Sequence, residues 1–184
     1  MKTRRAKQAE ILAGLAAFRP TLIETGLEPE VSHARILAAL EQFGECVRYL
    51  NTRRSKGTKL NLENEADVQD SIYLMLRPWI TDLVSENPTE KVGNRFAIKD
   101  FLAPTARTVI EAKFIRDAAH GKSISKELHD DIEVYRHHSR CDHLIFFVYD
   151  PDSLIPNVSS LSREMATARV YDGRALQCYL VVRP

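Results

Sequence analysis

Residues 108–115 read Thr-Val-Ile-Glu-Ala-Lys-Phe-Ile, an apolar run that two charged residues interrupt. β-Branched and aromatic residues favour strands, so we expect a strand over 107–115. Side chains of a strand alternate between the two faces of the sheet, which places Glu111 and Lys113 on the same face. An acid-x-lysine triplet is expected by chance in a chain of this composition, so its structural setting decides whether it has a function.

A second acid is expected to lie beside Glu111. The preceding strand, predicted over 94–102, contains Asp100, and a hairpin that turns near residues 105 and 106 places residue 100 opposite residue 111. Opposite residues on paired strands have β-carbons about 5 Å apart, where two like charges are destabilising. Two carboxylates there require a cation, which Lys113 or a divalent metal would supply.

The helix predicted over 62–77 contributes a further acid. Glu65 lies on the same helical stripe as Val68, Ile72 and Trp79, the stripe expected to pack on the sheet. A charged residue at the end of a buried stripe calls for an explanation. Either Glu65 joins the acids of the two strands, or it is one of the acids that favour the first turn of a helix.

The remaining pattern is that of an α/β protein. Three strands follow the 62–77 helix, and a helix then leads to the apolar run 143–149, typical of a strand buried on both faces. This order predicts a mixed sheet flanked by helices, antiparallel at its start, with a parallel crossover to the central strand. The other expected elements are strands at 82–86 and 176–183 and helices at about 124–138 and 159–168.

The N-terminal third is predicted to be a separate helical region. Apolar residues recur at helical spacing on both sides of Pro20 within residues 5–52, which indicates a helical hairpin. A polar, basic stretch follows, so we divide the chain into a helical region, 1–60, and an α/β domain, 61–184. The basic side chains of this stretch either bind phosphates or are ordinary solvated residues: Arg53, Arg54, Lys56 and Lys59.

The composition excludes several classes of protein. The chain has 184 residues, 44% hydrophobic and 28% charged, which is typical of a globular domain rather than a disordered segment. Its net charge of +1 argues against a protein that coats nucleic acid indiscriminately. Three widely spaced cysteines indicate reduced thiols, and no stretch is apolar enough to span a bilayer. We therefore expect a cytoplasmic protein that is not bound to a membrane.

The charged groups of the predicted strands and helix fit one reaction. Mg²⁺ prefers oxygen ligands and commonly binds through one or two carboxylates and a substrate phosphate. A metal held in this way polarises a phosphodiester oxygen and lowers the pKa of a bound water. A lysine beside it orients the water and stabilises the charge that develops on phosphorus. The residues therefore predict a metal-dependent phosphodiester hydrolase.

Asp100, ten further residues and then Glu111-Ala112-Lys113 resemble the PD-(D/E)xK nuclease signature, with Lys99 where the motif has proline. The order of elements resembles the αβββαβ core of that superfamily, the restriction-endonuclease-like fold, here preceded by the helical hairpin. Four segments are similar to a bacterial branch grouped with DpnII/MboI-type restriction enzymes: residues 65–69, 109–113, 131–135 and 141–151.

This resemblance implies a role for each residue of the motif. Asp100 and Glu111 would be metal ligands, assisted by the backbone carbonyl of Ala112, and Lys113 would be the catalytic lysine. Glu65 would support the metal, directly or through a water. Mg²⁺ is the implied cofactor, with Mn²⁺ able to substitute. Three more residues would face the same cleft or pack beside the ligands: Gln69, Asp131 and Tyr135.

The same residues allow other interpretations. The charges on the two strands would also fit a solvated ion cluster on an exposed face. A group of side chains at the end of the helix predicted at about 124–138 and just after it could bind zinc. Adjacent histidines at a helix end diverge, however, and no second ligand pair has a zinc-finger spacing. This group comprises His137, His138, Cys141 and His143.

We therefore expect a Mg²⁺-dependent endonuclease that hydrolyses DNA, within bacterial restriction or phage defence. Cleavage of both strands of a duplex is easiest for a two-fold dimer, so we expect a homodimer joined through the N-terminal helices. Two alternatives stay open. One is a non-catalytic, nuclease-like subunit that binds a protein partner through the same helices. The other is a nuclease that acts on RNA.

Overall fold

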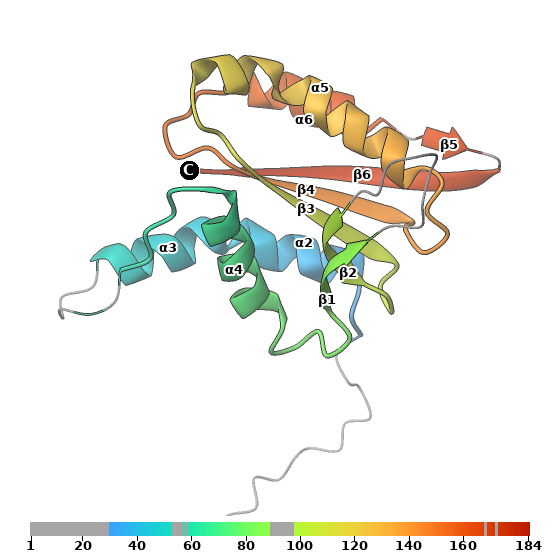
Figure 1. Cartoon of the computed structure of the whole chain (residues 1–184), viewed down its shortest axis with the longest axis horizontal. Helices are drawn as coiled ribbons and strands as arrows, with labels where there is room; N and C mark the ends of the chain where they lie inside the picture. Colours follow the sequence, from blue (N-terminus) through green and yellow to red (C-terminus); the bar gives the residue numbers. More distant parts are fainter. Residues whose placement is uncertain (1–29, 53–56, 58, 89–97, 168, 172) are drawn as a thin grey trace, which may run out of the picture. The chain divides into compact units, whose positions relative to one another are not determined.

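Six strands form the sheet of this protein, in the order β1-β2-β3-β4-β6-β5 (Figure 1). The structure is a computed structural model, and it describes residues 30–52, 57, 59–88, 98–167, 169–171 and 173–184. The strands are β1 (Val84–Pro88), β2 (Ile98–Ala103), β3 (Thr108–Phe114), β4 (His143–Tyr149), β5 (Arg169–Tyr171) and β6 (Arg174–Arg183). Strands β3, β4 and β6 are parallel, and the pairs β1–β2, β2–β3 and β5–β6 are antiparallel.

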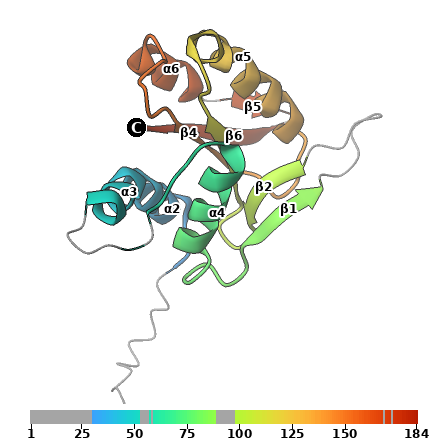
Figure 2. The same cartoon turned by 60° about the vertical axis from the view of Figure 1, so that its left-hand side comes forward.

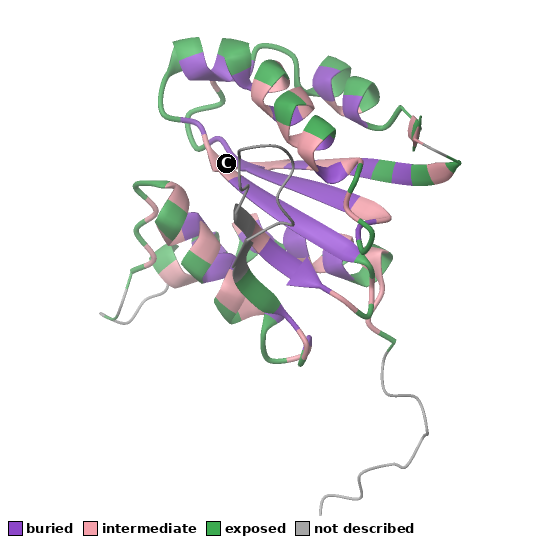
Figure 3. Cartoon of the chain, turned by 45° about the vertical axis from the view of Figure 1, so that its right-hand side comes forward, coloured by how far each residue is buried: buried purple, intermediate pink, exposed green. Residues whose placement is uncertain are grey.

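Helices cover both faces of the sheet. They are α2 (His33–Glu41), α3 (Phe43–Thr52), α4 (Glu65–Leu76), α5 (Ala118–Tyr135) and α6 (Val158–Met165). Helices α5 and α6 lie on one face, and α2, α3 and α4 lie on the other (Figure 1). Figure 3 shows the central strands as the buried layer, with exposed residues on the outer sides of the helices.

Side chains of alternating residues on the central strands supply two separate cores. Ile145 and Phe147 of β4 belong to the core beneath α2, α3 and α4, whereas Leu144 and Phe146 belong to the core beneath α5 and α6. All four are completely buried, as expected for a parallel strand with helices on both sides. The predicted mixed sheet and αβββαβ order, from α4 to β4, are confirmed.

The predicted hairpin register is also confirmed. Phe101 pairs with Ile110 and Leu102 pairs with Val109, so the residue numbers of each pair have the same sum as 100 and 111. The turn occupies residues 104–107, and Arg107 has a positive φ of 49° there. This register, continued by one residue, brings Asp100 beside Glu111.

Among the element boundaries that differ from the prediction, the starts of α5 and α4 are set by side-chain caps. Helix α5 begins at Ala118 rather than near residue 124, since the Asp117 carboxylate accepts a hydrogen bond from the His120 N–H at 2.8 Å. Helix α4 begins at Glu65 because the Asn64 side chain caps it through the Asp67 N–H. The short strand β5 was not predicted, because three residues are too few for a recognisable pattern.

Helix α5 approaches the loop after β4 unusually closely. A β-carbon added at Gly121 would lie 2.5 Å from the Leu154 carbonyl oxygen, so only glycine fits without a shift of the backbone. The buried Asp150 carboxylate fixes this loop, since it accepts hydrogen bonds from the backbone N–H groups of Leu154 and Ile155 at 2.8 and 2.9 Å. The glycine therefore allows α5 to pack against a rigid loop.

The described part of the predicted N-terminal region packs on the sheet. Ile36 and Leu40 of α2 and Phe43 and Val47 of α3 are buried in the same core as α4. The predicted helix before Pro20 lies outside the described residues, and the boundary at residue 60 stays a prediction. Among the described helices, none has the length and apolar character that a bilayer-spanning segment requires.

Candidate active site

Strand β3 presents a core on one face and charged side chains on the other. Ile110 and Ala112 are completely buried in the core beneath α4. Because side chains alternate, Glu111 and Lys113 project toward α5, where Lys113 contacts Asp131 and Glu111 contacts Tyr135. Ile110 and Ala112 of this strand thus support the fold, whereas Glu111 and Lys113 form the candidate site on its other face.

Asp100 joins this group from β2. Its Oδ2 atom accepts a hydrogen bond of 2.7 Å from the backbone N–H of Ala112, which orients the carboxylate. Burial raises the pKa of Asp100 to about 6, although this hydrogen bond and the charge of Lys113 act in the opposite direction. The negative charge of Glu65 raises the pKa further. Asp100 is therefore a half-buried carboxylate among other charges.

Glu111 is the most buried carboxylate of the group. Only 4% of the residue is exposed, and the Tyr135 hydroxyl of α5 donates a hydrogen bond to its Oε1 atom. Burial raises the pKa of Glu111 to about 8, and the neighbouring charge of Asp100 raises it as well. Burial and the nearby Glu111 also raise the pKa of Tyr135, so the phenol stays a donor. Two adjacent acids with raised pKa values form a place where a cation is stabilising.

Lys113 lies between two acids. Its ammonium nitrogen is 3.1 Å from Asp131 Oδ2 and 3.9 Å from Glu111 Oε2. Burial acts to lower the pKa of Lys113, but the charges of Asp131 and Glu111 outweigh it, and the pKa is raised. Burial raises the pKa of Asp131, an effect that the lysine opposes. The lysine is therefore a fixed positive charge held by a carboxylate from another element.

Helix α4 brings two polar residues to the same group. The charge of Glu65 acts on both Asp100 and Lys113, and the Gln69 side chain forms a hydrogen bond with Asp100. These residues are four apart, one helical turn, so they share a face of α4. Figure 2 shows α4 running beside β1 and β2. The structure thus gathers residues from α4, β2, β3 and α5.

The other candidate residues are the basic stretch after α3 and the histidine-rich stretch after α5. Lys59 is exposed to solvent. Arg53, Arg54 and Lys56 lie outside the residues that the structure describes. His143 stacks on His33, with ring centroids 3.7 Å apart, and Asp142 in the same loop pairs with Arg107. The histidine-rich stretch after α5 thus contacts α2 and the β2–β3 turn.

The donor set suits a hard cation. In the described part of the chain, no group of three or more His, Cys, Asp or Glu side chains lies close enough to hold a metal by itself. Asp100 and Glu111 would instead share the ion with the Ala112 carbonyl, water and a substrate oxygen. Mg²⁺ is commonly bound in this way, because it keeps several waters and takes few carboxylates. The residues present therefore fit a divalent metal.

Sequence reasoning missed the residues beyond Gln69 on the same face of α4. Tyr73 follows Gln69 by four residues and Glu65 by eight, so helical spacing could have placed it beside the site. With Asp70 and residues of β1 and β2, it lines a hollow that Asp100 borders. Nothing in the sequence indicates which strand residues complete this hollow, because only the packing of α4 against β1 and β2 brings them together.

A restriction-endonuclease-like fold with Asp100, Glu111 and Lys113 on adjacent strands defines the class of PD-(D/E)xK nucleases. A model of the DpnII-MboI restriction endonuclease family (REase_DpnII-MboI) matches residues 34–183, and the chain belongs to this family. The match includes α2 and α3 as well as the sheet. No curated protein and no solved structure matches the chain. Membership of this family implies DNA as the substrate, and restriction endonuclease families generally use divalent metals.

Proposed function

We propose that this protein is a Mg²⁺-dependent endonuclease that hydrolyses DNA phosphodiester bonds in bacterial restriction, as part of defence against phage in the cytoplasm. The convergence of Asp100, Glu111 and Lys113 supports this proposal more than any other observation. A solvated ion cluster would leave these side chains exposed, whereas only 5% of the Glu111 side chain and 16% of the Lys113 side chain are exposed.

Each residue has a role that follows from its surroundings. Asp100, Glu111 and the Ala112 carbonyl would hold Mg²⁺, or Mn²⁺ in its place, and Glu65 would act on it through a water. The bound metal would supply Lewis-acid polarisation of the phosphodiester and a more acidic water. Lys113 stays protonated, so it would stabilise the negative charge that develops on the phosphate oxygens.

Three further residues would keep these groups in place. Gln69 donates a side-chain hydrogen bond to Asp100, Asp131 holds the Lys113 ammonium, and Tyr135 holds one oxygen of Glu111. A misplaced catalytic group loses much of its effect, because proximity and orientation supply a large part of the rate. These three are positioning residues in our proposal.

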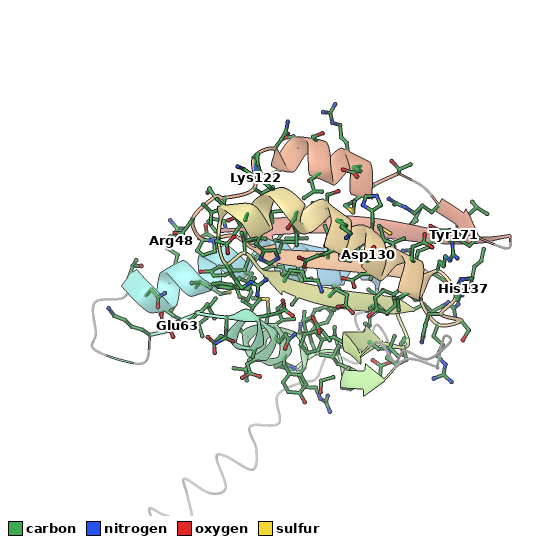
Figure 4. The ribbon with its side chains drawn as sticks, turned by 45° about the horizontal axis from the view of Figure 1, so that its top comes forward. Arg48, Glu63, Lys122, Asp130, His137 and Tyr171 are labelled. Carbon is green, nitrogen blue, oxygen red and sulfur yellow. The ribbon has the colours of Figure 1, made fainter. Side chains whose placement is uncertain are left out.

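Cleavage of a supercoiled plasmid tests the proposed function. The wild-type protein should nick or linearise DNA with Mg²⁺ and should be inactive in EDTA. Lys113→Ala and Glu111→Ala should each lower the rate by about 100-fold or more, as expected for a group that stabilises the transition state. Lys122→Ala is the matched control, since Lys122 is an exposed residue of α5 (Figure 4).

Two results would contradict the proposal. Cleavage that survives both Lys113→Ala and Glu111→Ala would come from another site or a contaminant. A stable complex with another protein, together with no Mg²⁺ or Mn²⁺ binding in calorimetry, would favour a non-catalytic subunit. Parallel assays with an RNA substrate distinguish the RNA-directed alternative. Mass measurement in solution tests the proposed homodimer, which would use the N-terminal helices as its interface.

A further inference from the structure

A hollow lies between α4 and the β1–β2 hairpin, next to the candidate active site. It has a volume of about 230 Å³. Figure 2 shows the two elements that form its walls, α4 and the paired strands β1 and β2. The lining residues are Gln69, Asp70 and Tyr73 of α4, Ser85 of β1, and Asp100 and Phe101 of β2.

The hollow shares a wall with the metal-binding carboxylates. Asp100 lines it, and Gln69 both lines it and forms a hydrogen bond with Asp100. Asp100 in turn accepts the N–H of Ala112, between Glu111 and Lys113. A phosphodiester bound at these groups would therefore have this hollow directly beside it, within reach of one adjoining nucleotide.

The walls offer the two kinds of contact that a nucleobase needs. The half-buried ring of Tyr73 is stacked on the buried ring of Phe101, with centroids 6.4 Å apart and an interplanar angle of 27°. Phe101 thereby supports a tyrosine that faces the hollow. Aromatic side chains held in this way stack on bases without regard to sequence.

The polar groups of the hollow add a preference among bases. The Asp70 carboxylate is exposed and accepts hydrogen bonds, the Gln69 amide both donates and accepts, and the Ser85 hydroxyl does so as well. Carboxylates pair with the exocyclic amino groups of bases, which cytosine, adenine and guanine carry and thymine lacks. The hollow therefore favours a base with an amino group.

We propose that this hollow binds one nucleobase of the DNA, stacked on Tyr73 and with its amino group on Asp70, next to the phosphodiester that is cleaved. The proposal rests on the proposed nuclease function, because that function places a phosphodiester at Asp100. It adds a subsite that makes the protein prefer an amino-bearing base at one position beside the cut.

Titration with the four deoxynucleoside 5′-monophosphates tests the subsite without any cleavage. In Mg²⁺ buffer, backbone amide NMR signals of Gln69, Asp70, Tyr73 and Ser85 should shift on addition of dCMP. The dissociation constant of dTMP should be severalfold higher, because thymine has no amino group. Tyr73→Ala should raise the dissociation constant of dCMP by about tenfold, whereas Tyr73→Phe should retain the wild-type value.

A matched pair of variants separates the role of Asp70 from a general loss of charge. Asp70→Ala should abolish the difference between dCMP and dTMP. Asp152→Ala should retain it, since Asp152 is an exposed aspartate that follows β4 and does not line the hollow. Unchanged discrimination in Asp70→Ala would show that this carboxylate does not read the base, and it would overturn that part of the proposal.

The outcomes also distinguish this proposal from the nuclease function. If the protein cleaves DNA but dCMP shifts none of the four signals, or Tyr73→Ala binds dCMP as the wild type does, the subsite is overturned and the nuclease stands. If Tyr73-dependent binding of dCMP is found in a protein that cleaves no DNA, the nuclease function fails and the hollow is still a nucleobase site.

Discussion

The Asp131 carboxylate lies 3.1 Å from the ammonium nitrogen of Lys113, closer than the 3.9 Å that separates the lysine from Glu111. The lysine is thus held by α5 and not only by its own strand. The contact with Asp131 holds the positive charge of Lys113 in place near the end of β3. Asp131 is therefore expected to aim the lysine at the substrate.

Removal of the Asp131 charge should reduce turnover more than binding. We expect Asp131→Asn to lower kcat by about 10- to 100-fold with little change in KM, because a misaligned catalytic group loses rate without losing substrate contacts. Asp130→Asn is the matched control, since Asp130 is the preceding, exposed residue of α5 (Figure 4). Steady-state cleavage of an oligonucleotide duplex measures both constants. Equal losses in the two variants would indicate a general effect of charge on α5.

The hydroxyl of Tyr135 should contribute to metal affinity. It donates a hydrogen bond to Glu111, which stabilises the charged form of a buried carboxylate. Tyr135→Phe removes this bond, and we expect the dissociation constant of Mg²⁺ or Mn²⁺ to rise by about 10- to 100-fold, as for other residues that support metal ligands. Isothermal titration calorimetry measures it.

A second tyrosine provides the control for the Tyr135 experiment. Tyr49 of α3 is 69% exposed, so Tyr49→Phe removes a hydroxyl of the same kind from the protein surface. The metal dissociation constant should stay at its wild-type value in this variant. Wild-type affinity in Tyr135→Phe would show that the hydroxyl does not support Glu111 as a ligand.

The contribution of the pair formed by Arg107 and Asp142 to stability should depend on pH. The hydrogen bond from Arg107 holds the pKa of Asp142 below its ordinary value of 3.8. A lowered pKa in the folded state stabilises it at any pH above 3.8, and this contribution is lost as the pH falls through the folded-state pKa. Urea unfolding should therefore show Asp142→Asn less stable than the wild type at neutral pH, with the difference vanishing in acid. A difference that persists at the lowest pH would mean that lost packing, not charge, causes it.

The close approach at Gly121 should make this position intolerant of any side chain. Gly121→Ala places a β-carbon 2.5 Å from the Leu154 carbonyl oxygen, and overpacking of this kind typically costs about 1–3 kcal/mol. The free energy of unfolding in urea should fall by that amount. Lys122→Ala, at the next residue of the same helix, should leave it almost unchanged or raise it slightly, because alanine favours helix. A Gly121→Ala protein as stable as Lys122→Ala would mean that the loop fixed by Asp150 moves at little cost.

The parts of the fold that follow from local pattern were predictable from the sequence. The continuous apolar run of β4 predicted a buried central strand. A turn near residues 105 and 106 predicted the hairpin register, which places residue 100 opposite residue 111. The start of α5 was predicted too late because the apolar pattern begins only at Ile124, whereas the Asp117 cap starts the helix at Ala118.

The candidate site was predictable to the extent that it lies on paired strands. Asp100, Glu111 and Lys113 follow from the strand register, whereas Asp131 and Tyr135 were expected only from the resemblance to the restriction enzyme family. Which of these groups touch could not be derived, because the distance from Lys113 to Asp131 depends on how closely α5 packs on the sheet. The same holds for the hollow beside Tyr73, whose walls come from segments that no local pattern relates.

The alternation along β3 also limits how this sequence can change. A deletion of one residue in the turn at 104–107 would invert the strand, so that Ile110 and Ala112 would project toward α5 and Glu111 and Lys113 would enter the apolar core beneath α4. Insertions and deletions in this turn should therefore be acceptable only when they preserve register. The same register of the β2–β3 hairpin places both the core residues and the charged residues of β3. A change that preserves the fold at this turn therefore also preserves the candidate site.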